Sequence, residues 1–456
     1  MTLRPYPEYK DSGAPWVEDI PAHWQMKRAK TLFQKMERPV RDFDEVVTCF
    51  RDGVVTLRKN RRTEGFTNSL KEIGYQGIRK GDLVIHQMDA FAGAVGVSDS
   101  DGKGTPVYSV CQPVNDANQY YYAYIVREMA RSQWITSLAT GIRERSTDFR
   151  YNTFAMQFIP FPPPDEQAAI VAFLDAAEQR IRRYIRAKQK LIALLNEQKQ
   201  AIIQQAVTRG LNPDVPMKDS GVEWLGVIPA HWELIPNRGL FTIKKSIVGS
   251  RSSEYDLLSL TLRGIILRDL ENVQGKFPAN FDTYQVVEPG DFVFCFFDVD
   301  ETPRTVGLSK HRGMITGAYT VMETTNLAPS RYLYYYYLSL DERKALKPIY
   351  RGLRKTIPIN WFLAAKSPYP PFKEQVDIVS LLDSVMDRIQ PVIDSLQLQI
   401  NLIQEYRTRL IADVVTGKVD VRGLVFELPE DFADEDLPAV DLDDLLADDG
   451  LEEIEE

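Results

Sequence analysis

Cysteine and long apolar runs are scarce in this sequence of 456 residues. The three cysteines, Cys49, Cys111 and Cys295, are odd in number and have neither Cys-x-x-Cys nor another metal-ligand spacing, which argues against a disulfide framework and a zinc site. No apolar stretch reaches the roughly 18 residues that a membrane span needs. The first residues lack the apolar core of a signal peptide. We therefore expect a cytoplasmic protein with reduced thiols and no membrane span.

Signatures of catalysis are also missing. The sequence has no glycine-rich loop after a strand, no phosphate-binding lysine motif and no carboxylate pair with a lysine that would indicate a nuclease. One segment, Tyr369-Pro-Pro-Phe372, is similar to the Asn/Asp-Pro-Pro-Tyr/Phe motif of adenine methyltransferases. The first residue of that motif accepts the hydrogen bonds of the target amino group, a role in which a tyrosine cannot mimic it, and a stop before a helix explains the prolines. We therefore expect no catalytic site and no cofactor, and a fused methyltransferase fragment is disfavoured.

What the sequence does contain is two copies of one unit. Four short matches keep a constant shift of 208 residues across most of each copy, which chance does not explain. The matches are Lys10-Asp-Ser-Gly13 with Lys218-Asp-Ser-Gly221, Ile20-Pro-Ala-His-Trp24 with Ile228-Pro-Ala-His-Trp232, Glu166-Gln167 with Glu374-Gln375, and Val207-Thr208 with Val415-Thr416. Residues 5–24 match 213–232, which follow directly on the first long amphipathic segment. By this symmetry we expect residues 5–24 to pack near 410–426.

Between these markers the two copies diverge. Gly141-Ile-Arg143 still matches Gly352-Leu-Arg354 at a shift of 211, but most residues around such matches differ. Short β-branched and aromatic runs between Gly, Asp and Pro indicate strands. Tyrosine-rich stretches at 120–124 and 332–337 indicate a helix or strand of the core. The two regions are therefore interpreted as mixed α/β domains mounted on a shared framework.

Each copy ends in a long amphipathic segment. Apolar residues recur there at alternating steps of three and four over four heptads, which is typical of helices that pack as a coiled coil. The expected seam consists of Leu174, Ala177, Ile181, Tyr184, Lys188, Leu191, Leu195, Gln198 and Ile202 in the first helix, and of Leu382, Val385, Ile389, Val392, Leu396, Gln399, Ile403, Tyr406 and Leu410 in the second. We expect the helices to pack on each other, with a bend or local break at Pro391, which has no amide hydrogen.

The repeated Pro-Ala-His-Trp sequence contains two of the four histidines, His23 and His231. No Cys, Asp or Glu accompanies them at a metal-ligand spacing. We therefore expect no metal site, and interpret each His-Trp pair as a packed structural element at the entry to a variable domain.

Basic and amide residues gather in turn-prone stretches of both variable regions. Lys and Arg attract phosphates, Arg can bind guanine O6 and N7 bidentately, and Asn or Gln can read adenine. The candidate DNA-binding residues are Arg58, Lys59, Asn60, Arg61, Arg62, Gln87, Arg143, Arg145 and Arg150 in the first region, and Lys244, Lys245, Arg251, Arg304, Arg351, Arg354 and Lys355 in the second. The alternative for each is a solvated surface charge. The matched places of Arg143 and Arg354 favour a role for these two.

The charge of the chain is unevenly distributed. Residues 427–456 hold 15 Asp and Glu and no Lys or Arg, so removing these 15 charges from the net charge of −9 leaves +6 on residues 1–426. Such an acidic segment with few apolar anchors is expected to lack stable structure. Two roles stay open for it, a solubilising extension and an intramolecular DNA mimic that competes for the basic surface.

Taken together, the boundary motifs resemble those of a known family. Two variable regions, each opened by Ile-Pro-x-His-Trp and closed by Pro-Pro-x-x-Glu-Gln before a long helix, are similar to the specificity subunits of type I restriction-modification enzymes. The resemblance covers residues 5 to about 425. Pro391 and the acidic tail after Phe426 depart from the family pattern. The base-reading residues of the family do not transfer, because those domains vary.

The resemblance implies an α+β fold with two target-recognition domains separated by two antiparallel helices. The implied division is an N-terminal segment 1–20, a first domain 21–162, a central helix 163–208, a linker 209–228, a second domain 229–370, a C-terminal helix 371–417, and a C-terminal segment 418–456. The implied partners are double-stranded DNA, two methyltransferase subunits and restriction (translocase) subunits. The chain itself is then non-catalytic, and each domain reads one half of a bipartite, asymmetric target. The alternative is a coiled-coil interaction scaffold without a DNA role.

Overall fold

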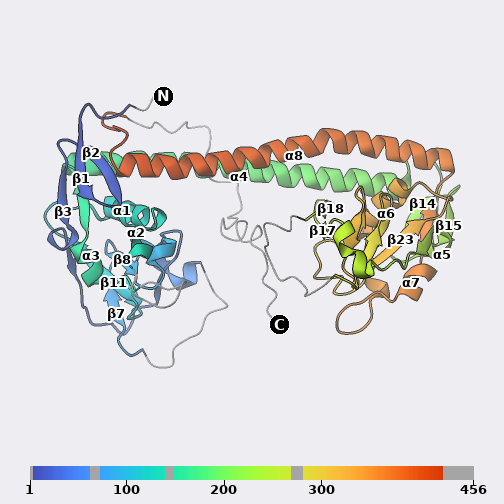
Figure 1. Cartoon of the computed structure of the whole chain (residues 1–456), viewed down its shortest axis with the longest axis horizontal. Helices are drawn as coiled ribbons and strands as arrows, with labels where there is room; N and C mark the ends of the chain where they lie inside the picture. Colours follow the sequence, from blue (N-terminus) through green and yellow to red (C-terminus); the bar gives the residue numbers. More distant parts are fainter. Residues whose placement is uncertain (1–3, 62–71, 139–147, 269–280, 425–456) are drawn as a thin grey trace. The chain divides into compact units, whose positions relative to one another are not determined.

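A computed structural model describes residues 4–61, 72–138, 148–268 and 281–424 (Figure 1). The chain divides into two compact units. Of the described residues, unit 1 contains those up to Ala187 together with 399–424, and unit 2 contains Lys188–Leu398. Each unit therefore contains one variable domain and half of each long helix.

Unit 1 is built around a four-stranded antiparallel sheet in the order β4-β11-β8-β9. Its strands are β1 (Tyr9–Ala14), β2 (Val17–Pro21), β3 (Gln25–Arg28), β4 (Phe33–Lys35), β5 (Val47–Cys49), β6 (Val55–Leu57), β7 (Gln76–Ile78), β8 (Leu83–His86), β9 (Val95–Val97), β10 (Gly102–Gly104), β11 (Tyr108–Pro113) and β12 (Phe158–Phe161). Its shorter helices are η1 (Ala29–Thr31), η2 (Arg58–Asn60), η3 (Ala90–Ala92), α1 (Gln119–Arg131), α2 (Trp134–Ser137) and α3 (Tyr151–Met156).

Unit 2 repeats this plan, with a four-stranded antiparallel sheet in the order β16-β23-β20-β21. Its strands are β13 (Met217–Asp219), β14 (Val227–Pro229), β15 (Glu233–Pro236), β16 (Phe241–Ile243), β17 (Leu258–Thr261), β18 (Gly264–Leu267), β19 (Gln285–Val287), β20 (Phe292–Phe294), β21 (Val306–Leu308), β22 (Gly313–Ile315), β23 (Thr320–Thr324) and β24 (Lys366–Tyr369). Its shorter helices are α5 (Asn237–Leu240), η4 (Gly249–Glu254), α6 (Ser330–Glu342), η5 (Lys347–Ile349) and α7 (Ile359–Ala364). The equivalent strand order confirms that the sequence repeat is a structural repeat.

The tyrosine-rich stretches form the helices α1 and α6, which confirms that they belong to the core. Tyr121 and Tyr332, which match at a shift of 211 residues, are both fully buried. A buried hydroxyl needs a hydrogen-bond partner. Tyr121 donates to the carbonyl oxygen of Val415 (3.0 Å) and Tyr332 to that of Pro368 (3.2 Å). These bonds tie each helix to the long helix or the strand that packs on it.

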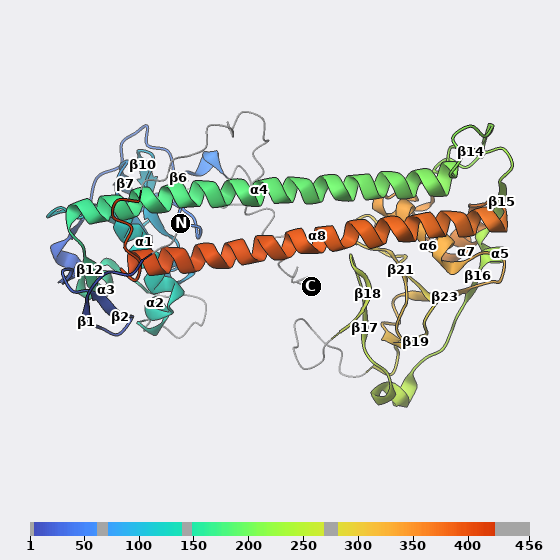
Figure 2. The same cartoon turned by 90° about the horizontal axis from the view of Figure 1, so that it is seen from above.

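The long helices are α4 (Pro164–Arg209) and α8 (Phe372–Val415) (Figure 2). In unit 1, Arg407 of α8 forms a two-pronged ion pair with Glu178 of α4, with N–O distances of 2.9 and 3.0 Å. In unit 2, Lys199 of α4 donates to Gln390 of α8 (3.5 Å). The start of each helix thus lies beside the end of the other, so the helices pack on each other antiparallel.

The seam is narrower than the heptad pattern predicts. Leu174, Ala177 and Leu410 lie in the core of unit 1 and are at most 6% exposed. In contrast, Tyr184, Leu191 and Tyr406 are 50, 44 and 54% exposed, so their predicted place in the seam is wrong. A single partner helix covers only a narrow stripe, and large side chains at its edge remain in contact with water.

Of the predicted bend or local break at Pro391, the break is wrong, and the bend stays a prediction. The helix α8 continues without interruption through Pro391. Proline removes one hydrogen bond to the carbonyl of the residue four positions earlier, here Asp387. Because Pro391 is exposed, water can solvate that carbonyl. No helix in the described part of the chain combines the length and apolar character of a membrane span.

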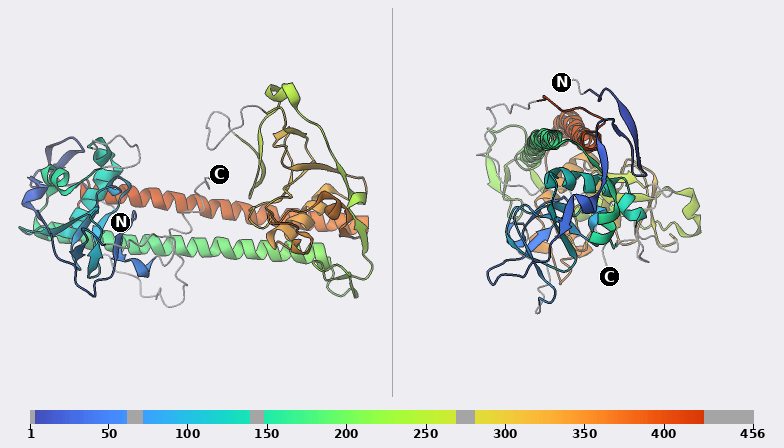
Figure 3. Two further views of the ribbon diagram at one scale, coloured as in Figure 1. Left: turned by 90° about the horizontal axis from the view of Figure 1, so that it is seen from below. Right: turned by 90° about the vertical axis from the view of Figure 1, so that its left-hand side faces the viewer.

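The two ends of the described chain meet in unit 1, as the repeat predicts (Figure 3). Arg4 forms an antiparallel bridge with Asp420, and the hydroxyl of Tyr9 donates to the carbonyl of Lys418 (3.2 Å). Trp16 packs against the same core as Leu410 and Val421. Residues 4–24 therefore pack beside residues 410–424, which confirms the predicted closure.

Candidate nucleic-acid interface

One projecting loop of unit 2 carries the matched candidate Arg354. Arg351 and Thr356 exchange backbone hydrogen bonds of 2.8 and 2.9 Å, which close a four-residue tip of Gly352, Leu353, Arg354 and Lys355. Gly352 has φ +71°, a conformation that glycine adopts without a steric penalty. The whole tip is exposed.

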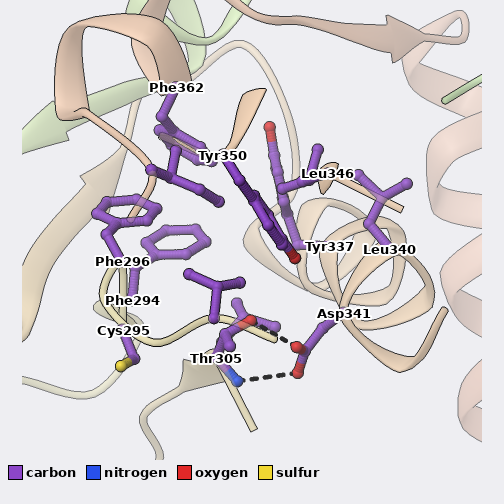
Figure 4. A pocket seen from close by; sticks show the side chains of 13 residues that line it. Phe294, Cys295, Phe296, Thr305, Tyr337, Leu340, Asp341, Leu346, Tyr350 and Phe362 are labelled. Atoms are coloured by element: carbon purple, nitrogen blue, oxygen red, sulfur yellow. Dashed lines mark hydrogen bonds between the residues drawn. The ribbon is translucent and has the colours of Figure 1, made fainter. Parts of the chain in front are cut away.

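An aromatic cluster lies beneath this loop (Figure 4). The rings of Phe294, Phe296, Tyr337, Tyr350 and Phe362 face a small cavity there. Aromatic rings bury large areas and hold fixed orientations, so the cluster is a firm base.

Hydrogen bonds fasten the loop to that base. The amide of Ile357 donates to the carbonyl of Phe296 (2.8 Å), and the amide of Asp298 donates to the carbonyl of Arg354 (2.9 Å). The backbone of the loop is thus joined to the domain within its tip, at Arg354, and directly after the loop, at Ile357.

Two cations of the loop are held by neighbours. Lys355 pairs with Asp300 (2.5 Å), and this hydrogen bond lowers the pKa of Asp300. The guanidinium of Arg351 lies 3.9 Å from the ring centre of Trp361 and donates to two backbone carbonyls. Arg354 has no side-chain partner among the described residues, so its five N–H donors face solvent.

Two other candidates in unit 2 serve the interior of the domain. Lys244 pairs with the buried Asp291 (2.6 Å), and the side chain of Arg304, only 11% exposed, pairs with the buried Asp341 (3.4 Å). Asp341 also accepts hydrogen bonds from the backbone and hydroxyl of Thr305. In these contacts the charges of Lys244 and Arg304 compensate buried carboxylates, so they serve the interior of the domain.

The remaining candidates of unit 2 are Lys245 and Arg251. Both are exposed, and no side-chain partner is found for them among the described residues. Lys245 follows the strand β16, and Arg251 lies in η4, away from the loop at 351–356 in sequence. Lys245, Arg251 and Arg354 are therefore the exposed candidates of unit 2 for which no side-chain partner is found among the described residues.

The basic cluster of unit 1 is mostly paired within its own domain. The described members have these partners: Arg58 donates to the Thr48 hydroxyl (3.2 Å), Lys59 pairs with Glu45 (2.5 Å), Asn60 donates to the Thr56 hydroxyl (2.9 Å), and Arg61 pairs with Asp52 (2.8 Å). Lys59 has a side chain that is 61% exposed, whereas that of Arg61 is 17% exposed. Among the described cations of this cluster, Lys59 is thus the most available to a ligand.

The other candidates of unit 1 provide less evidence of a surface that contacts DNA. Gln87 donates weakly to the Pro106 carbonyl (3.5 Å) and the Ser109 hydroxyl (3.4 Å), and Arg150 pairs with Asp148 (2.7 Å) with its side chain 68% exposed. Arg62, Arg143 and Arg145 lie outside the described residues, as does the acidic tail.

Sequence reasoning missed a second exposed Leu-Arg pair in unit 2. The hairpin of β17 and β18 turns at Leu262 and Arg263, which are both exposed, Leu262 by 65%. Gly264, with φ +94°, follows this pair. A leucine beside an arginine and a glycine between two short strands was the available signal.

The repeated motifs form the junctions between domains and helices, not the candidate interface. His23 contacts Glu166 (2.7 Å), and His231 contacts Glu374 (2.8 Å). The ring of Tyr6 lies 5.6 Å from that of His23. Both histidines thus have structural contacts at the start of a long helix. Among the described residues, no group of three or more His, Cys, Asp or Glu is arranged to hold a metal ion.

Comparison with known proteins gives a structural likeness only. No family model and no curated protein matches the sequence. A chain from a structure described as "Structural basis underlying complex assembly and conformational transition of the type I R-M system" is 14% identical, with 87% of this chain and 98% of that chain covered and a TM-score of 0.63. This likeness shows that the two chains share a fold.

Two further solved structures match with lower TM-scores. The HsdS subunit from Thermoanaerobacter tengcongensis is 16% identical, with 88% and 98% of the two chains covered and a TM-score of 0.46. The type I restriction-modification system S subunit from M. genitalium is 14% identical, with 88% and 98% covered and a TM-score of 0.38.

Proposed function

We propose that this chain is the DNA-specificity subunit of a type I restriction-modification enzyme. The observation that carries the proposal is the structural repeat. Two domains with the same strand order stand on equivalent long helices, and the framework motifs are retained while the residues between them differ. A framework that is constant beside surfaces that vary is expected of a protein that reads two different sequences with one architecture.

The fold likeness and the surface chemistry support the proposal. The chain of the type I R-M structure shares this fold over 87% of the present chain. Unit 2 presents Lys245, Arg251 and Arg354 to solvent, and exposed cations supply the phosphate attraction and guanine contacts that DNA recognition needs. In this proposal each domain reads one half-site, and the antiparallel helices set the spacer between them.

The proposed subunit is non-catalytic and acts in the cytoplasm. Two methyltransferase subunits carry out adenine methylation, and restriction (translocase) subunits join them for cleavage. The chain contributes recognition of double-stranded DNA without a cofactor of its own. A coiled-coil interaction scaffold is the second candidate, because two helices as long as α4 and α8 would suffice to bind partner proteins without any contact to DNA.

The test is selection from a library of random duplexes. The chain is co-expressed with its methyltransferase partner from the same host, and the complex selects among duplexes of about 40 base pairs with a randomised centre. We expect a bipartite, asymmetric consensus with an unspecified spacer, and affinity that falls steeply with salt. A purified complex that selects no consensus would contradict the DNA-specificity proposal and favour the scaffold.

Mapping methylated adenines in the host genome gives an independent check. The methylated sites should contain the selected consensus, and exchanging residues 21–162 for another domain of this fold should change one half of it only. If both halves change together, the proposal of one half-site per domain is wrong.

A further inference from the structure

The tip of the loop at 351–356 presents an apolar side chain together with a free arginine. Leu353 is 104% exposed, as open to water as a leucine in an extended peptide. A leucine side chain gains free energy when it leaves water, and this gain is not realised at the tip. Singly exposed leucines are common in proteins. Leu353 differs from these because the loop around it is fixed.

The residues beside Leu353 and Arg354 are held in place. Lys355 has φ +42°, a left-handed conformation that is unfavourable for a non-glycine residue. Its side chain is held by Asp300, and its amide donates to the carbonyl of Gly352 (3.2 Å). A backbone that accepts this cost to project two side chains into solvent is organised to contact a ligand.

The electrostatics of the segment select the kind of ligand. Residues 343–356 contain six Lys and Arg and no Asp or Glu. Asp300, which binds Lys347 and Lys355, and Asp341, which binds Lys344, compensate part of this charge. Arg351 and Arg354 have no carboxylate partner among the described residues. These two guanidinium groups suit the tip to a phosphate-bearing ligand, although the surroundings of the loop also include Asp298 and Glu301.

We propose that Leu353 and Arg354 enter a groove of the second half-site as one unit, with Leu353 in apolar contact with base edges and Arg354 hydrogen-bonded beside it. The inference rests on the proposed function and deepens it, because it assigns base recognition to an uncharged residue. Leucine is among the side chains that insert into DNA grooves, and bases offer apolar faces and methyl groups that phosphates do not. Leu353 thus contributes specificity, whereas the surrounding cations contribute affinity for any sequence.

The experiment compares Leu353→Ser with the parent in the complex with the methyltransferase. Both complexes select from the random duplex library at the same salt concentration. We expect the variant to lose about ten-fold or more of its preference at one or two adjacent base pairs of one half-site. The other half-site and the salt dependence of binding should stay unchanged, because no phosphate contact is removed.

The control is Leu327→Ser, which removes another exposed leucine of the same unit, 46% exposed and away from the loop. It should select the parental consensus. Leu353 has no neighbours to lose, so the melting temperature of Leu353→Ser should match that of the parent, and a loss of preference cannot then be attributed to misfolding.

The outcomes separate the inference from the proposed function. A parent complex without sequence preference would contradict both. A parent with a bipartite consensus that Leu353→Ser reproduces at every position would overturn this inference alone. Loss of the methyltransferase from purified Leu353→Ser would also overturn it, because the tip would then bind protein. Loss of preference confined to one half-site, with the complex intact, supports it.

Discussion

The two junctions where a domain meets its long helix use the same motif differently. In unit 1, the buried Glu166 contacts His23 (2.7 Å), Trp24 (2.8 Å), Tyr6 (3.1 Å) and Arg422 (3.3 Å). The junction of unit 2 has fewer contacts. There Glu374 binds His231 (2.8 Å), while the buried indole nitrogen of Trp232 and the amide oxygen of Gln375 have no hydrogen-bond partner among the described residues.

Chain connectivity explains the difference. In unit 2 the counterparts of both terminal segments belong to one continuous stretch, residues 210–232, which packs beside Glu374. In unit 1 the junction joins residues 4–24 to residues 417–424, so the Arg4–Asp420 bridge closes a loop of more than 400 residues. Loop closure costs about 0.6 kcal/mol per doubling of length, or roughly 2.5 kcal/mol more than for a segment of about 20 residues. The additional contacts of Glu166 offset this cost.

The largest expected effect comes from removing the shared carboxylate. Glu166→Ala leaves the indole of Trp24 and the hydroxyl of Tyr6 buried without an acceptor, so unit 1 should lose roughly 3–5 kcal/mol. Glu374→Ala leaves a His231 side chain that is 43% exposed, which water can solvate, so unit 2 should lose about 1 kcal/mol or less. Hydrogen exchange of peptides from α1 and α6 reports the two units separately. Equal losses would contradict the explanation from connectivity.

The second comparison concerns the helices, because Pro391 of α8 corresponds to Arg183 of α4 at the shift of 208 residues. Proline in a helix interior is about 3 kcal/mol less favourable than alanine, and its restriction of the unfolded chain returns up to about 1 kcal/mol. Pro391→Ala should therefore stabilise α8 by roughly 1–3 kcal/mol in hydrogen exchange of residues 385–398. Arg183→Ala is the control and should stay within about 0.5 kcal/mol of the parent. A destabilised Pro391→Ala would show that the proline is adapted to its place.

The sequence predicts the features that are written in local patterns or exact repeats. The heptads predict both long helices, and the identical markers predict that residues 4–24 pack beside the end of α8. The sheet order could not be read, because most of its strands are only three or four residues long and pair with segments far away in sequence. The local break expected at Pro391 does not occur, because the rule that proline disrupts a helix interior takes no account of solvent exposure.

The candidate interface was predictable only in part. Arg354 stands out because its neighbourhood is matched in both copies. Lys244 and Arg304 look like surface cations in sequence, but their partners, Asp291 and Asp341, lie 47 and 37 residues away. An ion pair across such a distance has no local signature. The same holds for Leu353, whose exposure depends on how the loop closes.

A smaller effect is expected at the N-terminal caps of α1 and α6. In unit 1 the backbone amide of Asn118 donates to the side-chain oxygen of Gln167 (2.8 Å). The side chain of Asn118 caps α1. The equivalent residue in unit 2 is Pro329, which has no N–H, and this leaves Gln375 without a donor. Pro329→Asn supplies both the donor and the cap and should stabilise unit 2 by about 1 kcal/mol in hydrogen exchange of α6.

Asn118→Pro is the matched reverse change. It removes the cap and the donor from unit 1 and should destabilise α1 by about 1–3 kcal/mol. If Pro329→Asn leaves α6 unchanged while Asn118→Pro destabilises α1, the orphaned oxygen of Gln375 is satisfied by water, and this contrast between the units disappears.

The smallest expected effect tests the exposed edge of the closure in unit 1. Arg422 pairs with Asp420 (2.7 Å) and with Glu166 (3.3 Å), but its side chain is 44% exposed, so screening by water leaves Arg422→Ala a loss of only about 0.5–1 kcal/mol at low salt. At 1 M salt the Debye length is about 3 Å, and the difference from the parent should vanish. Asp214 occupies the equivalent position in unit 2 and is exposed, so Asp214→Ala should change neither unit. Hydrogen exchange of α1 at both salt concentrations measures the effect. A loss that persists at 1 M salt would mean that Arg422 acts through packing on the ring of Tyr6, 4.9 Å away, and not through its charge.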